Sequence, residues 1–535
     1  MKNTSDVEND STIAFTGGRI LTMDSEQIHV ETVVISGGRI AAVGDKSILK
    51  SFPNAEIHDL KGRILLPAFI DSHNHLSSFG CFFPTWANLI GLTEKESVLE
   101  EIRMQARKKP GKEWIVGFGW FDAKIGGVDL TKKDLDEISS DRPVLLIQAT
   151  FHQSVVNTRA LELLEIDRST LDPRCGMILR ESDGTPTGVL VEYAQVPAFK
   201  LVMETNMRTL VELIEARAKE LLQFGITAIH DPGVTPAAEA AYRQLHAEGL
   251  LPVSVLMMPH GETLLDNQLG DRLRGPVTGD GDEKLRVGPV KLFADGATAE
   301  TVAFSLKIGG QIINSGNYRD DFEEMLFAAT EQGFQVCVHS FGNATTDAVL
   351  TAFEKAALRA PAGFEMRPRL EHVTLISALQ IKRLAAMGGC ACIQPQFLSR
   401  AQNTKQVVLE EGKWYAYGDL VKGGVTVASS SDDPGGFMDA RDPIQGSVMG
   451  STMSDAAGNV IFPDQVLPFE QWLWMYTAGG AYAGGQEKER GMLKKGMVAD
   501  LVILEGNLDP KNPPVVAETW VAGKQVYDYK IKLGI

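Results

Sequence analysis

The chain has 535 residues, of which 44% are hydrophobic, so it is long enough to enclose a large core. Its formal net charge is −17 and its pI is about 5.2, which argues against nucleic acid or an anionic membrane as a partner. Five scattered cysteines do not form a disulfide framework or a zinc motif, so we expect a reducing, cytoplasmic location.

Residues 1–11 are polar and acidic, which is not the pattern of a secretory signal, and no apolar run reaches the roughly 18 residues of a membrane helix. Residues 12–62 contain short β-rich runs separated by Gly-Gly pairs, and similar runs return at residues 499–527 around Gly523-Lys524. Such pairs are typical of hairpin turns. We therefore predict one small sheet domain built from residues 1–62 and 490–535.

Residues 63–489 alternate between apolar strands and helices, which predicts a parallel sheet. Residues 77–205 interrupt this rhythm, and their length and aromatic content suggest an insertion that covers the active site and selects the substrate. The predicted strands are residues 65–70, 226–230, 253–258, 288–293, 334–339, 367–372, 390–394 and 425–429. Eight such units indicate a (β/α)8 barrel, whose active site lies at the carboxyl ends of the strands.

The first of these strands runs into two histidines, His73 and His75. Alternate side chains of a strand share one face, so we expect these two imidazoles to point the same way and to bind one divalent cation. A His-x-His pair alone is a weak indication of metal.

Four further polar residues lie at later strands: Lys291, His339, His372 and Asp432. Alone, the histidines could be structural and Asp432 could cap a helix or make a turn. A lysine in an apolar strand is harder to explain, because a buried lysine needs a partner or a chemical change. Since barrel strand ends converge on one mouth, the set predicts a site for one or two divalent metals.

The order His-x-His, Lys, His, His, Asp resembles the amidohydrolase superfamily, in the branch that contains N-substituted formamide deformylases. The similar stretches are residues 66–75, 290–296, 369–372, 431–432 and the tail 491–502. The resemblance implies an α/β fold with a distorted (β/α)8 barrel and a composite β-sandwich domain. It also implies a small-molecule substrate and hydrolysis of an amide-like C–N bond, as in an amide, formamide, carbamate or cyclic imide.

The same resemblance implies roles for the six residues. All six would bind metal, with zinc as the first expectation and manganese or iron left open. Lys291 would be carboxylated to bridge two ions, and Asp432 would take the proton of the attacking water. Two alternatives stay open: ester or lactone hydrolysis, decarboxylation or isomerisation on the same scaffold, and a non-catalytic regulatory or binding protein. A homo-oligomer is also left open.

Within residues 77–205, three side chains are candidates for substrate contact. His152 lies in Phe151–Asn157, which resembles a family stretch near the substrate. Trp120, together with Asp122, and Arg180 are weaker candidates, because core packing or a structural role explains them as well. His230, at a strand end, is expected to support the site or the fold, and a functional role for Asp295, near the end of the Lys291 strand, is left open.

Overall fold

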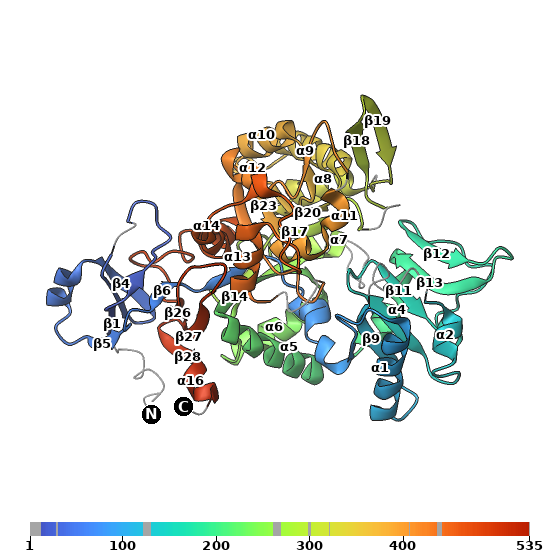
Figure 1. Cartoon of the computed structure of the whole chain (residues 1–535), viewed down its shortest axis with the longest axis horizontal. Coiled ribbons are helices and arrows are strands. Elements are labelled where there is room, and N and C mark those ends of the chain that lie inside the picture. The colour runs from blue at the N-terminus through green and yellow to red at the C-terminus, as the bar shows by residue number, and fades with distance from the viewer. Residues whose placement is uncertain are drawn as a thin grey trace.

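The computed structural model describes residues 12–27, 30–120, 130–260, 269–297, 301–319, 321–405, 407–435 and 441–533. The predictions for residues 1–11 and for Asp122 therefore lie outside the described residues. The fold is mixed α/β, as expected, with the all-parallel sheets at the centre of the molecule and sheets of mixed parallel and antiparallel pairing on either side (Figure 1). Within the described part of the chain, no helix has both the length and the apolar composition of a membrane span.

Two parallel sheets contain the strands predicted for the middle of the chain, in the orders β16-β15-β14-β7 and β17-β20-β21-β23-β25. Isolated parallel bridges join the two sheets, from His260 to Lys291 and from Asn74 to Asp433. The strands are β7 (Phe69–Asp71), β14 (Ile226–Val234), β15 (Ser254–Pro259), β16 (Leu285–Val287), β17 (Val290–Phe293), β20 (Val336–Ser340), β21 (Arg369–His372), β23 (Cys390–Ile393) and β25 (Thr426–Ser429).

The structure corrects the prediction of one continuous strand leading into the two histidines. Strand β6 (Ile64–Pro67) pairs with β26 (Leu501–Glu505) in a different sheet, and only β7 belongs to the parallel one. The change of sheet follows Pro67, which has no N–H to donate to a continuing ladder. His73 and His75 lie beyond the end of β7, on either side of the bridging residue Asn74.

Helices follow most of the parallel strands along the chain, and two more, α13 (Pro443–Thr452) and α14 (Phe469–Trp474), come after the last one. At the start of α5 (Met207–Leu221), Asn206 caps the helix by accepting a hydrogen bond from the Thr209 N–H. Leu210, Ile214 and Leu221 on the same helix face the core. The remaining helices among these are α6 (Pro236–Ala247), α8 (Phe322–Glu331), α9 (Asn343–Ala357), α10 (Ala378–Ala386) and α12 (Tyr417–Lys422).

Strands from both ends of the chain share one five-stranded sheet, in the order β2-β6-β26-β27-β28, beside a four-stranded sheet, β4-β3-β1-β5. The predicted hairpin at Gly37-Gly38 is confirmed, and both glycines have positive φ. The strands not yet given are β1 (Ile13–Thr16), β2 (Arg19–Ile20), β3 (Thr32–Ser36), β4 (Arg39–Gly44), β5 (Glu56–Asp59), β27 (Val515–Val521) and β28 (Lys524–Asp528).

The interrupting block, residues 77–205, contains a six-stranded sheet of its own, in the order β12-β13-β11-β10-β9-β8 (right of Figure 1). Side chains alternate between its faces: Val144 and Leu146 pack in a core within the block, whereas Leu145 and Ile147 face the main core. Its elements are β8 (Ala87–Asn88), α1 (Lys95–Lys108), β9 (Ile115–Trp120), α2 (Lys132–Asp136), β10 (Val144–Gln148), β11 (Gln153–Val156), α3 (Thr158–Leu163), β12 (Gly176–Arg180), β13 (Pro186–Glu192) and α4 (Val196–Met203).

Candidate active site

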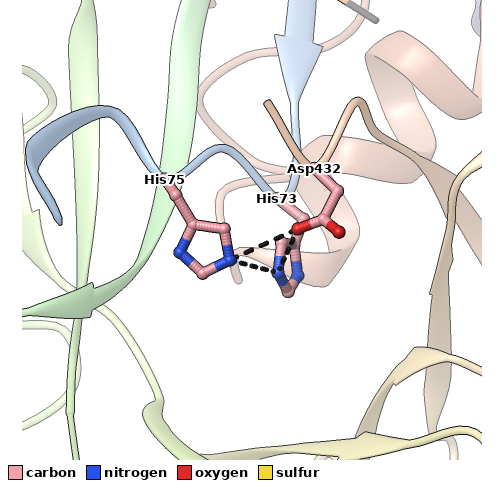
Figure 2. Close-up of side chains that lie close together, drawn as sticks. All are labelled: His73, His75 and Asp432. Carbon is pink, nitrogen blue, oxygen red and sulfur yellow. Dashed lines mark hydrogen bonds and ion pairs between the residues drawn. The ribbon is translucent and has the colours of Figure 1, made fainter. Parts of the chain in front are cut away.

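Three of the predicted metal ligands form a close triangle. His73 Nε2, His75 Nε2 and Asp432 Oδ1 each lie 3.3 Å from the other two atoms (Figure 2). Ligand atoms bound at 2.0–2.1 Å to a tetrahedral zinc ion would lie roughly 3.3 to 3.4 Å apart. The triangle therefore has the size of one face of a metal coordination shell.

A buried ion pair between Arg369 and Glu371 orients the His73 ring. His73 Nδ1 lies 2.6 Å from Glu371 Oε2, and Arg369 Nε donates to Glu371 Oε1 at 2.6 Å. Burial alone would raise the pKa of Glu371, but Arg369 and His73 hold it well below its usual range, so the carboxylate is ionised. Because a carboxylate only accepts, Nδ1 of His73 carries the proton, and its Nε2 lone pair is left for a metal.

The two later histidines are oriented in the same way. His372 Nδ1 donates to Gln394 Oε1 at 2.8 Å, and His339 Nε2 donates to the Gly296 carbonyl at 3.1 Å. Their rings lie 4.5 Å apart between centroids, and His372 lies 4.9 Å from His73. Burial lowers the pKa of His339 well below its usual value and that of His372 to about 3, which keeps both rings neutral, as a metal ligand must be.

Lys291 is 1% exposed in β17, and its Nζ lies 4.7 Å from the centroid of the Phe293 ring. Burial lowers the pKa of the Lys291 amine, because the charged form is poorly solvated there. The attraction of the Glu371 and Asp432 carboxylates favours the charged amine, but burial outweighs it. The prediction that this lysine is unusual therefore agrees with its surroundings.

Asp432 is positioned by the turn that follows β25. Its φ is +58°, in the left-handed region, and its N–H donates to the His73 carbonyl at 2.8 Å. The side chain of Asp71 accepts hydrogen bonds from Ser431 Oγ at 2.5 Å and from Ser431 N at 2.9 Å. Burial would raise the pKa of Asp432, but its close contacts with the His73 and His75 rings hold it well below its usual range.

A cavity of about 530 Å³ opens at these strand ends. Of the predicted site residues, the structure brings six to its wall: His75, His152, Lys291, His339, His372 and Asp432. His73 lies behind them and is fully buried. Asp295 also lines the cavity, where burial raises its pKa to about 7 although Phe341 and Gly342 donate backbone hydrogen bonds to it.

Trp120 and Arg180 are not among the described residues that line the cavity. Trp120 is 1% exposed and packs in the core within the block. Arg180 donates to the carbonyl oxygens of Asp167, Gly184 and Thr170, so its guanidinium holds loops of the block together. We expected Trp120 and Arg180 to contact the substrate, but the structure places both side chains away from the cavity.

The sequence reasoning did not single out Glu192, which lines the cavity beside His152. Glu192 ends β13 directly after the apolar run Val189–Val191. That pattern, a polar side chain at the end of an apolar strand, is the one that identified the later metal-site residues, and it could have identified Glu192 as well. Arg369 carried no such signal, because its importance depends on partners far away in the sequence.

Comparisons with known proteins agree with this arrangement. Residues 56–527 match the amidohydrolase family. The putative amidohydrolase YtcJ of Bacillus subtilis is 30% identical over 96% of this chain and 98% of its own, and N-substituted formamide deformylase of Arthrobacter pascens is 28% identical over 91% and 92%. The crystal structure of an uncharacterized metal-dependent hydrolase from Pyrococcus horikoshii is 25% identical with a TM-score of 0.72, covering 93% of this chain and 98% of that one. The chain belongs to the amidohydrolase family.

Proposed function

We propose that the protein is a metal-dependent hydrolase that cleaves an amide-like C–N bond of a small organic substrate, such as an amide, formamide, carbamate or cyclic imide. The observation that carries this proposal is the triangle of His73, His75 and Asp432 at 3.3 Å beside a cavity of about 530 Å³. Membership of the amidohydrolase family and the similarity to N-substituted formamide deformylase support the C–N bond as the target.

The donor set fits zinc, since His73, His339 and His372 are each held as a tautomer that leaves one ring nitrogen free. His73, His75 and Asp432 would hold one ion, and His339 and His372 a second. A divalent cation bound there supplies Lewis-acid stabilisation of developing negative charge and lowers the pKa of water.

We propose that Lys291 is carboxylated and shared between the two ions. An ammonium group there would repel metal cations strongly at low dielectric. The lowered pKa of Lys291 favours the neutral amine, which is the form that adds CO₂. The resulting carbamate would supply the carboxylate oxygens that a bridging ligand needs.

Asp432 is the proposed general base. Its low pKa keeps it ionised at neutral pH. It lies at the cavity wall beside His73 and His75. The leaving nitrogen needs a proton, because an amide anion is too basic to depart. One carboxylate can take the proton from water and then deliver it to that nitrogen.

Three further proposals concern the scaffold. Residues 63–489 would form a distorted (β/α)8 barrel, which the bridges between the two parallel sheets support. Residues 1–62 with 490–535 would form a composite β-sandwich domain, supported by the sheet shared between both ends. Residues 77–205 would cover the barrel mouth, with His152 in contact with the substrate. The positions of Trp120 and Arg180 favour structural roles instead.

A hydrolysis screen tests the function. Purified protein supplied with Zn²⁺ or Mn²⁺ is assayed against N-formyl amines, N-acyl amino acids, carbamates, cyclic imides and esters, and its metal content is measured in parallel. We expect one or two bound ions per chain and release of amine. Protein that binds no metal would favour the non-catalytic regulatory or binding role. Turnover of esters alone would favour ester hydrolysis on the same scaffold.

A further inference from the structure

The 77–205 block contributes a histidine–carboxylate pair to the cavity. His152 Nδ1 lies 2.7 Å from Glu192 Oε2, and the two side chains are only 15% and 11% exposed. The backbone reinforces the pair, because the Glu192 N–H donates to the His152 carbonyl at 2.9 Å. Since the carboxylate can only accept, Nδ1 of His152 carries the proton, and in the neutral ring Nε2 presents its lone pair.

Glu192 is held in place by the segment that follows β17. Its Oε1 accepts hydrogen bonds from Thr301 Oγ1 at 2.8 Å and from the Ala297 N–H at 3.3 Å. A Cβ on Gly296 would lie 2.1 Å from Oε1, so only glycine leaves room for the carboxylate there. Glu192 also has a φ of +50°, a strained conformation for a residue other than glycine.

Nε2 of His152 is the end of the pair available to a ligand. The structure gives this atom no hydrogen-bond partner within the described ranges, and His152 lines the cavity. Its ring lies 5.6 Å from that of His339, between centroids, so the lone pair is close to the proposed metal ligands. Aromatic side chains such as Phe79, Phe151 and Phe293 line the same cavity and reduce competition from water.

We propose that His152 Nε2 accepts a hydrogen bond from the N–H of the scissile amide, and that Glu192 is the positioning residue that fixes this tautomer. The assignment rests on the proposed function and narrows its substrates to amides that carry an N–H on the leaving nitrogen. As the carbonyl carbon becomes tetrahedral, the nitrogen gains a localised lone pair. The hydrogen bond to His152 would hold the N–H and leave that lone pair free to take the proton from Asp432.

An ester in the same cavity has oxygen in place of N–H and would leave Nε2 without a donor. A site built around a substrate N–H discriminates strongly against an analogue that lacks it. The pair therefore gives a physical reason for a preference for C–N over C–O bonds, which metal ligands alone do not supply.

The test compares matched substrates that differ only in NH against O, beginning with N-(2-phenylethyl)formamide and 2-phenylethyl formate. The ratio of kcat/KM for the amide to kcat/KM for the ester is measured in the metal-loaded wild type, His152→Phe and Glu192→Gln. All variants are assayed at the same pH on the alkaline side of neutrality, because Glu192 raises the pKa of His152 and Nε2 accepts a hydrogen bond only in the neutral ring. The matched control is His246→Gln, which breaks an exposed histidine–carboxylate contact of 2.9 Å to Asp282.

We expect the amide-to-ester ratio to fall at least 10-fold in His152→Phe and about 3-fold in Glu192→Gln. It should be unchanged in His246→Gln. General damage to the fold or the metal site lowers both rates together and leaves the ratio alone. The double variant should be no worse than His152→Phe, since Glu192 acts through the histidine.

An unchanged ratio in His152→Phe, with amide turnover present in the wild type, would overturn the inference and leave the proposed function standing. A metal-loaded wild type that cleaves no amide would overturn both.

Discussion

The cavity has two walls that are built in different ways. On the wall of parallel strand ends, His73, His339 and His372 are each fixed by a partner from another part of the chain. On the other wall, the 77–205 block has its own sheet and core and contributes both aromatic and polar side chains to the cavity, among them His152 and Glu192. The difference suggests that reaction type and substrate choice reside in separate structures, so the second can change without disturbing the first.

Removing ligands from the first wall should have the largest effect. The double variant His73→Ala, His75→Ala takes away two of the three atoms of the 3.3 Å triangle. We expect loss of bound metal and a fall in activity of at least about 1,000-fold, with the circular dichroism spectrum retained. Elemental analysis checks the metal, and full occupancy in the double variant would contradict the assignment.

Replacing the general base should lower activity less than removing two ligands, because the metal site survives in part. Asp432→Asn keeps the shape and one oxygen ligand but cannot take a proton, so kcat should fall about 100-fold or more. The wild-type rate should drop on the acid side, since the pKa of Asp432 is held below its usual range and the base must be ionised. The variant should lose this acid limb of the pH–rate profile. A near-normal kcat with metal bound would make another group the base, and Asp295 or His230 would be tested next.

The ion pair behind His73 offers a milder change to the same wall. Glu371→Gln should weaken metal affinity by about 10- to 100-fold, because the amide no longer secures the Nδ1–H tautomer of His73. Competition with a chelator measures the affinity. The exposed carboxylate Glu354, which pairs with Arg383, gives a control in Glu354→Gln. Equal affinities in the two variants would mean that the ring orientation of His73 does not depend on Glu371.

Weakening the second wall should leave the metal in place. Leu146 is fully buried in the core within the block, so Leu146→Ala should lower the free energy of unfolding by about 2–4 kcal/mol. We expect a lower melting temperature and a raised KM, with unchanged metal content. Loss of metal in this variant would show that the two walls are not independent.

The sequence predicts the first wall better than the second, and the reason is physical. Apolar runs followed by a polar residue mark the ends of buried strands, and this pattern located His339, His372 and Asp432. Whether β6 and β7 form one strand depends on partners hundreds of residues away, so the break at Pro67 was missed.

The second wall gave less signal because its side chains serve its own sheet. Trp120 and Arg180 have the composition of binding residues, yet one packs in a core and the other binds loop carbonyls. Glu192 is the exception: it follows the strand-end pattern after Val189–Val191, although its contacts with Thr301 and Gly296 depend on another part of the chain.

The contact between His73 and Glu371 joins residues 298 positions apart, and that between Asp71 and Ser431 spans 360. High contact order slows folding, because long loops must close before such contacts stabilise anything. During synthesis His73 emerges long before its partner, whereas the sheet of residues 77–205 pairs strands that are close in sequence and can form early. The metal ligands should therefore come together last, and a cation that binds only the finished site would stabilise the native chain after folding rather than guide its early steps.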